Sequence, residues 1–303
     1  MSEKRAMPGQ LRIGRIFYLN LYPIFHGLDE TVRDGRYVYL DGHPALVNKE
    51  LRGGGVDASP SSSIVYLKNP EDFSLIEGHS ISADGPIRSI YLFSRYPIEE
   101  LGGRLIGVTN QTETSAALLR IILKKFHSVD CEIRVTALTA VKALDKIGQK
   151  LDKGGRALDK GGAGKLGAYL AIGDDAMRAW KKLGEEQSPG SPGGQGAFPL
   201  LVYDLGGIWR DNTGLPFVFA LWIARKDRVA EKMRAFEQFR RDLDRAKDYA
   251  LSHFEDAARQ QPVRELSRKE VIEYWGGITY GLGPSEKKGL RLFGKYAREL
   301  GLL

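Results

Sequence analysis

Residues 11–23 read Leu11-Arg12-Ile13-Gly14-Arg15-Ile16-Phe17-Tyr18-Leu19-Asn20-Leu21-Tyr22-Pro23. The alternation of apolar and polar side chains over residues 11–16 predicts a strand. Pro23 favours the first turn of a helix, because the N–H that proline lacks would have no partner there. Next come a predicted helix over residues 44–51, the turn Gly53-Gly54-Gly55 and a short strand, Val56-Asp57-Ala58. This order of strand, helix and strand indicates an α/β fold.

The rest of the chain continues this alternation. Strands are predicted at residues 89–94, 105–108, 170–172 and 217–224, and helices after the polar turns 60–63, 112–115 and 173–175. The apolar run 217–224 suits the middle of a sheet that is covered on both faces. Residues 229–300 carry apolar side chains at helical spacing and are predicted to be mainly helical. With 303 residues, the chain exceeds the length at which one core usually stops growing, so two domains are expected.

The net charge of +7 raises the question of a nucleic-acid partner. The basic residues are interleaved with acidic ones, as in residues 240–245, so no basic patch is expected. The longest apolar run, 217–224, is too short to span a bilayer, and residues 1–10 lack the apolar stretch of a secretory signal. We therefore expect a cytoplasmic protein whose partner is a small anionic molecule, rather than nucleic acid or a membrane.

The motifs of several common chemistries are absent from the sequence. It contains no phosphate-binding Gly-x-x-x-x-Gly-Lys-Ser/Thr loop, no Gly-x-Gly-x-x-Gly, no His-Glu-x-x-His and no Gly-x-Ser-x-Gly. The five histidines lie far apart, and none has the spacing of a metal ligand. Cys131 is the single cysteine, and its neighbours offer nothing that would activate the thiol. We expect neither a metal nor an organic cofactor.

Polar turns recur where a predicted strand leads into a helix. They contain Asn20, Ser61 to Ser63, Thr112 to Ser115 and Gly173-Asp174. Each presents backbone N–H groups and hydroxyls that bind an anion without lysine or arginine. One such turn is ordinary helix capping, whereas several around a cleft between two α/β lobes are typical of carboxylate-binding proteins of the periplasmic-binding-protein type. At Asp174-Asp175, helix capping and a hydrogen bond between Asp174 and the substrate, with Asp174 as acceptor, both remain open.

Several segments resemble the chorismate dehydratases of the menaquinone pathway. They include Tyr18-Leu19-Asn20-Leu21-Tyr22-Pro23, Gly85-Pro86-Ile87-Arg88-Ser89-Ile90, Thr112-Glu113-Thr114-Ser115, Ile172-Gly173-Asp174-Asp175-Ala176 and the runs 56–63 and 209–219. The resemblance implies a type II periplasmic-binding-protein-like fold, with two α/β lobes and a central ligand cleft. We expect lobe one to comprise residues 1–95 and 208–303, and lobe two residues 96–207 with a flexible glycine-rich stretch near 150–167. The implied activity is that of a carbon-oxygen lyase that dehydrates chorismate to 3-[(1-carboxyvinyl)oxy]benzoate on the futalosine route.

The resemblance ties the chemistry to Asn20 and Ser89. Neither an amide nor an unassisted hydroxyl is a competent base near neutral pH, so both are expected to orient groups and to hydrogen-bond developing charge. The resemblance implies that the substrate's own enolpyruvyl carboxylate takes the proton. The expected substrate-binding residues are Ser61, Ser62, Thr114, Ser115, Gly173 and Asp174. Structural alternatives are an unusual turn conformation for Asn20, and for Ser89 a strand hydroxyl bonded to a neighbouring carbonyl.

Two other functions fit the same expected fold. A solute-binding protein for an aromatic carboxylate would share the anion-binding turns, but such proteins act outside the cytoplasm, and a secretory segment is not evident. The sister enzyme that forms dihydroxynaphthoate resembles this chain in fold, but has a Ser-Pro-Asn-Asp-type turn where this chain has Tyr18-Leu19-Asn20-Leu21. Conversion of chorismate would separate the dehydratase from both.

Overall fold

The computed structural model describes residues 9–109, 111, 113–148, 166–186 and 200–303. The chain forms two compact units, each with its own β-sheet. Unit 1 comprises residues 1–84 and 215–303, and unit 2 comprises residues 85–214. Most of the glycine-rich stretch 150–167, which the sequence predicts to be flexible, lies outside the described residues, and its last two residues begin a strand.

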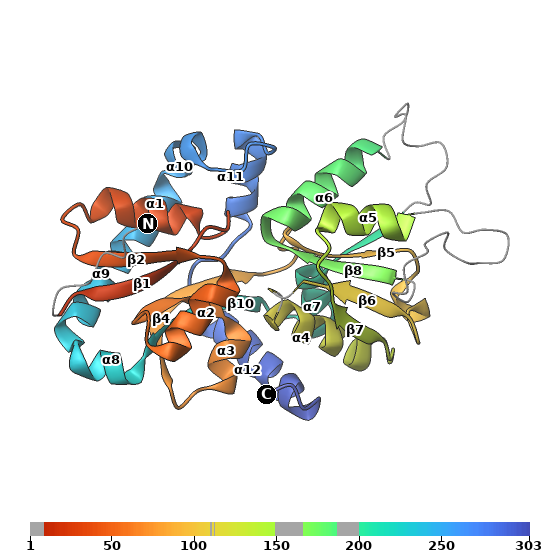
Figure 1. The fold of residues 1–303 in the computed structure, drawn as a ribbon, viewed down its shortest axis with the longest axis horizontal. Coiled ribbons are helices and arrows are strands. Elements are labelled where there is room, and N and C mark those ends of the chain that lie inside the picture. The colour runs from red at the N-terminus through yellow and green to blue at the C-terminus, as the bar shows by residue number, and fades with distance from the viewer. Residues whose placement is uncertain (1–8, 110, 112, 149–165, 187–199) are drawn as a thin grey trace. The chain divides into compact units, whose positions relative to one another are not determined.

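Unit 1 is built on a five-stranded sheet with the order β2-β1-β3-β10-β4 (Figure 1). Its strands are β1 (Leu11–Ile16), β2 (Tyr37–Gly42), β3 (Ala58–Ser62), β4 (Phe73–Ala83) and β10 (Phe217–Arg225). Strand β1 runs parallel to β2 and β3, whereas β10 runs antiparallel to β3 and β4. The predicted strand at 217–224 is confirmed, and its place between two neighbours explains why it is apolar along its whole length.

The helices of unit 1 precede and follow these strands. They are α1 (Tyr22–Thr31), α2 (Pro44–Gly53), α3 (Ser63–Lys68), α8 (Lys226–Glu231), α9 (Met233–Ser252), α10 (Phe254–Gln260), α11 (Arg268–Gly276) and α12 (Pro284–Glu299). Helices α1 and α9 pack against each other, and an added Cβ at Gly27 of α1 would press directly on the Ala246 carbonyl of α9. Glycine therefore permits this close approach. Trp222, Trp275 and Phe239 are among the largest fully buried side chains.

Unit 2 has a second five-stranded sheet, with the order β7-β6-β8-β5-β9. Its strands are β5 (Ile90–Ser94), β6 (Leu105–Val108), β7 (Glu132–Val135), β8 (Leu166–Ile172) and β9 (Leu201–Asp204). Its helices are α4 (Glu113–Ile121), which continues as a π-helix (Ile122–Phe126), α5 (Ala140–Gly148), α6 (Gly173–Glu186), α7 (Leu205–Thr213) and a 3₁₀ turn (Ile98–Glu100). The parallel strands β6, β7 and β8 alternate with helices as predicted for an α/β fold.

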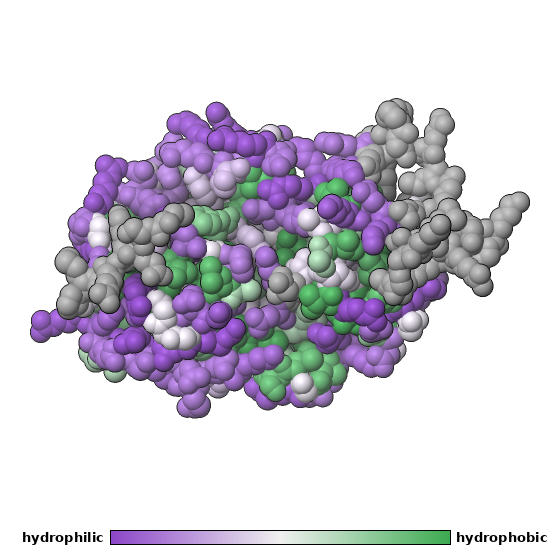
Figure 2. All heavy atoms as spheres, viewed as in Figure 1, coloured by the Kyte–Doolittle hydropathy of each residue, from purple (hydrophilic) through white to green (hydrophobic). Residues whose placement is uncertain are grey.

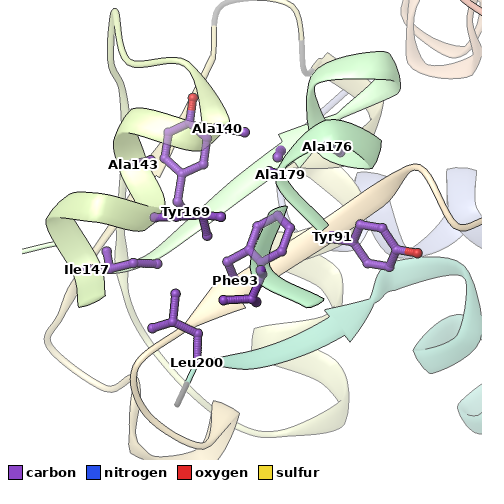
Figure 3. Packing of buried hydrophobic residues seen from close by; sticks show 12 residues of the cluster. Tyr91, Phe93, Ala140, Ala143, Ile147, Tyr169, Ala176, Ala179 and Leu200 are labelled. Carbon is purple, nitrogen blue, oxygen red and sulfur yellow. The ribbon is translucent and has the colours of Figure 1, made fainter. Parts of the chain in front are cut away.

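The core of unit 2 joins this sheet to α5 and α6 (Figure 3). Tyr91 and Phe93 of β5 and Tyr169 of β8 supply its aromatic rings, and alanines of α5 and α6 pack against them. The Tyr169 hydroxyl donates a 2.6 Å hydrogen bond to the Leu138 carbonyl, so the polar end of this buried ring is satisfied. The small alanine side chains let both helices lie close to the sheet.

The unit boundaries differ from those expected from the sequence. Residues 90–94 were expected in lobe one, but β5 is hydrogen-bonded to β8 and β9 of the second sheet. Likewise α7, most of which falls in the expected lobe one, contacts β5 and β9. The chain thus passes between the units after Asp84 and after Gly214. Apolar strands near a crossing do not reveal which of two sheets they join, because both sheets offer similar partners.

Polar and charged side chains cover most of the face drawn in Figure 2, as expected for a chain with 27% charged residues. Among the described residues, no helix combines the length and the apolar character that crossing a membrane requires.

Candidate active site

Asn20 lies in the turn that links β1 to α1. The preceding residue, Leu19, is fully buried, and its carbonyl accepts a 2.7 Å hydrogen bond from Trp275 Nε1. Asn20 Oδ1 is buried and has no hydrogen-bond partner among the described residues. Asn20 does not adopt a positive φ, since the non-glycine residues that do so in the described chain are Arg88 and Ser128. The structural alternative of an unusual turn conformation therefore does not account for an asparagine at this position. Its neighbours therefore hold the turn, and the amide oxygen stays available to a ligand.

The serine-rich segment, which the sequence predicts to be a turn after a strand at 56–58, instead ends β3, and Ser63 begins α3. Ser62 is the residue before α3, but its side chain makes no capping hydrogen bond, and its buried Oγ has no partner among the residues described. Ser61 Oγ lies 3.0 Å from Ser59 Oγ, and Ser63 Oγ donates a 2.6 Å hydrogen bond to the Val218 carbonyl. The expectation of side-chain capping is therefore wrong for Ser62, whose hydroxyl is left for another partner.

These residues meet at one edge of the unit 1 sheet. Strands β1 and β3 are parallel neighbours, with Ile13 opposite Ala58. The carboxyl ends of parallel strands lie at the same edge of a sheet. Asn20 follows β1, and Ser61 and Ser62 end β3, so the fold brings together the predicted site residues of unit 1.

In unit 2 the backbone joins Ser89 to Gly173. Ser89, which is 2% exposed, lies immediately before β5, and its carbonyl accepts a 2.8 Å hydrogen bond from the Gly173 N–H. Gly173 begins α6 with φ of 61°, a left-handed conformation that is costly for residues with a Cβ. Glycine at this position therefore lets the chain turn from β8 into α6 while it stays bonded to Ser89.

The other predicted residues of unit 2 belong to the same edge of its sheet. Strands β6 and β8 are parallel, so α4 and α6 both begin at the edge where these strands end. Strand β5 runs antiparallel to β8, which puts its beginning, and Ser89, at that edge. Thr114 and Ser115 are buried in the first turn of α4, and the predicted cap Thr112 lies outside the described residues. Ser89, Thr114, Ser115, Gly173 and Asp174 therefore gather at one edge.

A family model described as menaquinone biosynthesis matches residues 11–299. The chain belongs to this menaquinone biosynthesis family. A relative, the chorismate dehydratase of Thermus thermophilus, is 29% identical over 294 residues, which cover 94% of this chain and 93% of that protein. The alignment thus includes both edges described above.

Solved structures show the same fold in more distant proteins. Protein AF1704 from Archaeoglobus fulgidus has a TM-score of 0.64 and 14% identity, over 97% of this chain and 99% of that one. The periplasmic aliphatic sulphonate binding protein SsuA from Escherichia coli has a TM-score of 0.61 and 12% identity, over 98% of this chain and 89% of that one. This member of the menaquinone biosynthesis family therefore has the periplasmic-binding-protein-like α/β fold that the sequence predicts.

The two neighbouring aspartates at the start of α6 differ in their surroundings in this family member. Asp175 Oδ2 accepts a 2.7 Å hydrogen bond from the backbone N–H of Ala140, the first residue of α5. Asp175 thereby joins the start of α5 to the start of α6 and has a structural role. Asp174 is partly buried in the same first turn and stays a candidate for substrate contact.

Two residues that support the candidate site, Trp275 and Asp204, were not predicted from the sequence. Trp275 of α11 fixes the carbonyl before Asn20, as described above. Asp204, the last residue of β9, accepts hydrogen bonds from backbone N–H groups on both sides of it, at Ile87 and Gly206. Burial raises the pKa of the Asp204 carboxyl, although these N–H donors lower it. An aspartate shortly before Gly206-Gly207 indicates a helix N-cap in the sequence. Nothing in the neighbouring sequence indicates that the same carboxylate also bonds to Ile87 and Arg88.

Among the described residues, neither an activated cysteine nor a metal-binding cluster is found. Cys131 Sγ donates a hydrogen bond to the Leu101 carbonyl at 3.1 Å, and burial raises the pKa of the thiol, so it is not an activated nucleophile. No group of three or more His, Cys, Asp or Glu side chains is arranged to hold a metal ion in the part of the chain that the structure describes.

Proposed function

We propose that this member of the menaquinone biosynthesis family is a cytoplasmic chorismate dehydratase, which converts chorismate to 3-[(1-carboxyvinyl)oxy]benzoate and water. The similarity to the chorismate dehydratase of Thermus thermophilus carries this proposal, because it extends over 94% of the chain. The candidate residues support it, since each unit gathers them at one edge of its sheet.

The reaction places modest demands on the protein. A C–H bond breaks at the ring carbon that bears the ether, the neighbouring C–O bond to the hydroxyl breaks, and a ring double bond forms. The proton and the hydroxide leave as water, and the ring becomes aromatic, which provides a large driving force. The enzyme must therefore mainly hold the substrate in a reactive geometry and stabilise charge as it develops.

In this proposal Asn20 and Ser89 are the catalytic residues. Neither titrates near neutral pH, so both act through hydrogen bonds to the leaving hydroxyl and to the ring substituents. The buried Oδ1 of Asn20 supports this role, because it has no partner among the described residues and lies in the turn after β1, where a ligand can supply one. The enolpyruvyl carboxylate of the substrate acts as the base, and a cofactor has no step to perform.

The remaining candidate residues bind the substrate carboxylates and hydroxyl. Thr114, Ser115 and Gly173 lie in the first turns of α4 and α6, and the N-terminal end of a helix attracts anions. Ser62 offers a buried hydroxyl with no partner among the described residues, and Ser61 lies beside it. Asp174 accepts a hydrogen bond from the substrate hydroxyl.

The test is to incubate the purified protein with chorismate and to separate the products by chromatography with mass detection. The expected product is lighter than chorismate by one water and is formed equally well after treatment with a chelator. The Thermus thermophilus enzyme serves as the positive control. Binding of chorismate without conversion would instead indicate a solute-binding protein, and turnover that is lost with chelator and restored by zinc or magnesium would contradict the proposed mechanism.

A further inference from the structure

The carboxylate of Asp204 joins two segments that lie far apart in the sequence. Its oxygens accept hydrogen bonds from the N–H groups of Gly206 and Gly207 at 2.9 and 3.1 Å, which is ordinary capping of α7. They also accept from the N–H groups of Ile87 and Arg88 at 3.0 and 2.6 Å. Capping needs only the first pair of bonds. The second pair ties Asp204 to the segment immediately before Ser89.

That segment needs to be held. Arg88 has φ of 61°, a left-handed conformation that is unfavourable for a residue with a Cβ. Such a conformation persists only where the surroundings impose it. The 2.6 Å bond from Arg88 N–H to Asp204 is a restraint of this kind, and Ser89 is the next residue along the chain.

A glycine in α7 allows the two segments to approach. A Cβ added at Gly206 would lie 2.6 Å from the Gly85 carbonyl oxygen and 3.2 Å from Ile87 N. The turn at residues 85–88 is therefore packed against the first turn of α7 so closely that no side chain fits between them. At the neighbouring Gly207, an added Cβ would meet Pro86 Cγ at 3.5 Å, which is ordinary van der Waals contact.

The other side of Ser89 is also fixed. Its carbonyl is bonded to Gly173, and the next residue, Ile90, pairs with Ile172 of β8. Ser89 thus lies between the sheet on one side and the turn held by Asp204 on the other. The sheet fixes the position of the residue, and the turn fixes the direction from which the chain reaches it.

We propose that Asp204 is a positioning residue, which orients Ser89 for the reaction by holding the strained turn at Arg88. This inference rests on the catalytic role proposed for Ser89. In this proposal Asp204 acts through its bonds to backbone N–H groups and not by touching the substrate.

The first test is Asp204→Asn, alone and combined with Ser89→Ala. The amide keeps the shape of the side chain but replaces one accepting oxygen with a donor, so it cannot keep all of these bonds. We expect kcat to fall by about tenfold to a hundredfold with KM changed little, because a small displacement of a catalytic group costs turnover. In a protein that already carries Ser89→Ala, the same change should lower kcat by less than about threefold, because the group it positions is absent.

The second test leaves Asp204 in place and moves the turn. Gly206→Ala should lower kcat as Asp204→Asn does, whereas Gly207→Ala, whose methyl group has room, should keep the wild-type value. A third variant, Asp227→Asn, controls for loss of a carboxylate that accepts a backbone N–H in the first turn of a helix, since Asp227 accepts the Arg228 N–H at 2.9 Å in α8 of unit 1. Circular dichroism of each variant reports whether it is folded, and the two glycine variants decide the question if Asp204→Asn does not fold.

The outcomes separate the two proposals. Wild-type turnover in Ser89→Ala would remove Ser89 from the chemistry, and the positioning role with it. If Ser89→Ala is impaired while Asp204→Asn and Gly206→Ala turn over normally, the positioning inference alone is overturned. It is also overturned if the effects of Ser89→Ala and Asp204→Asn multiply fully in the double variant, because two independent residues would behave in that way.

Discussion

Replacement of Asn20 by alanine is expected to lower turnover without lowering stability. Asn20 Oδ1 is buried and has no partner in the described part of the chain, so the substitution removes a polar atom that gains nothing from the fold. A buried polar group without a partner costs about 1–3 kcal/mol. Lost side-chain contacts offset part of the gain, so we expect the free energy of unfolding to stay the same or to rise by about 1 kcal/mol. The upper value corresponds to a rise in Tm of about 2–4 °C for a domain of this size.

Turnover of chorismate by Asn20→Ala should fall by about 10²–10³, because one hydrogen bond to developing charge is lost. Asn48→Ala is the matched control. Asn48 is 2% exposed and also has a buried oxygen without a partner among the described residues, but it lies in the middle of α2 rather than in a turn after a strand. Thermal denaturation and steady-state kinetics on both variants measure the two effects separately.

The two variants should show similar stability and very different activity. A fall in the Tm of Asn20→Ala that accompanies its loss of turnover would make Asn20 a structural residue. Unchanged turnover would remove it from the chemistry. An equal loss of turnover in Asn48→Ala would refute the reasoning, because the effect would then not depend on the turn that follows β1.

Two further predictions concern stability. His79 Nε2 lies 3.1 Å from Asp244 Oδ1, and burial lowers the pKa of His79 from 6.5 to about 4. The neutral imidazole therefore contributes stability that is complete above about pH 6.5 and is lost as the pH falls towards 4. His79→Gln should reduce the drop in Tm between about pH 7 and pH 5 relative to wild type. In α12, alanine gains about 1 kcal/mol of helix propensity over glycine. Gly294→Ala should therefore leave Tm unchanged or higher, whereas Gly289→Ala should lower it, because its Cβ would press on the Pro216 carbonyl.

The strand with the longest apolar run could be predicted from the sequence, whereas a strand with buried polar side chains could not. The predicted strand at 217–224 corresponds to β10, whose neighbours in the sheet require apolar side chains. Strand β4 was missed because Ser80 and Ser82 are buried within it. Their hydroxyls lie 2.7 Å apart, and Ser80 also donates to the Gly281 carbonyl. Partners this distant in sequence satisfy polar groups that a local pattern assigns to the surface.

The residues of the candidate site also fall into those that the local sequence predicts and those whose partners are distant in the sequence. Asn20 and Gly173 could be predicted because strand, turn and helix follow one another locally, and resemblance to a family supplied Ser89. Asp204 could be predicted only as a helix cap, since its bonds to Ile87 and Arg88 span 117 and 116 residues. The sheet order had to be known before these segments could be seen as neighbours.

That sheet order also explains why Asp204 is suited to hold Ser89. Strand β5 is the first strand of unit 2 and β9 is the last, and they are antiparallel neighbours with Tyr91 opposite Asp204. The end of β9 therefore meets the beginning of β5, at the same edge where β6 and β8 end. Since the bonds run to backbone N–H groups, they constrain the conformation of residues 87 and 88 but not their side chains. The fold can thus fix the approach to Ser89 without depending on which side chains stand at residues 87 and 88.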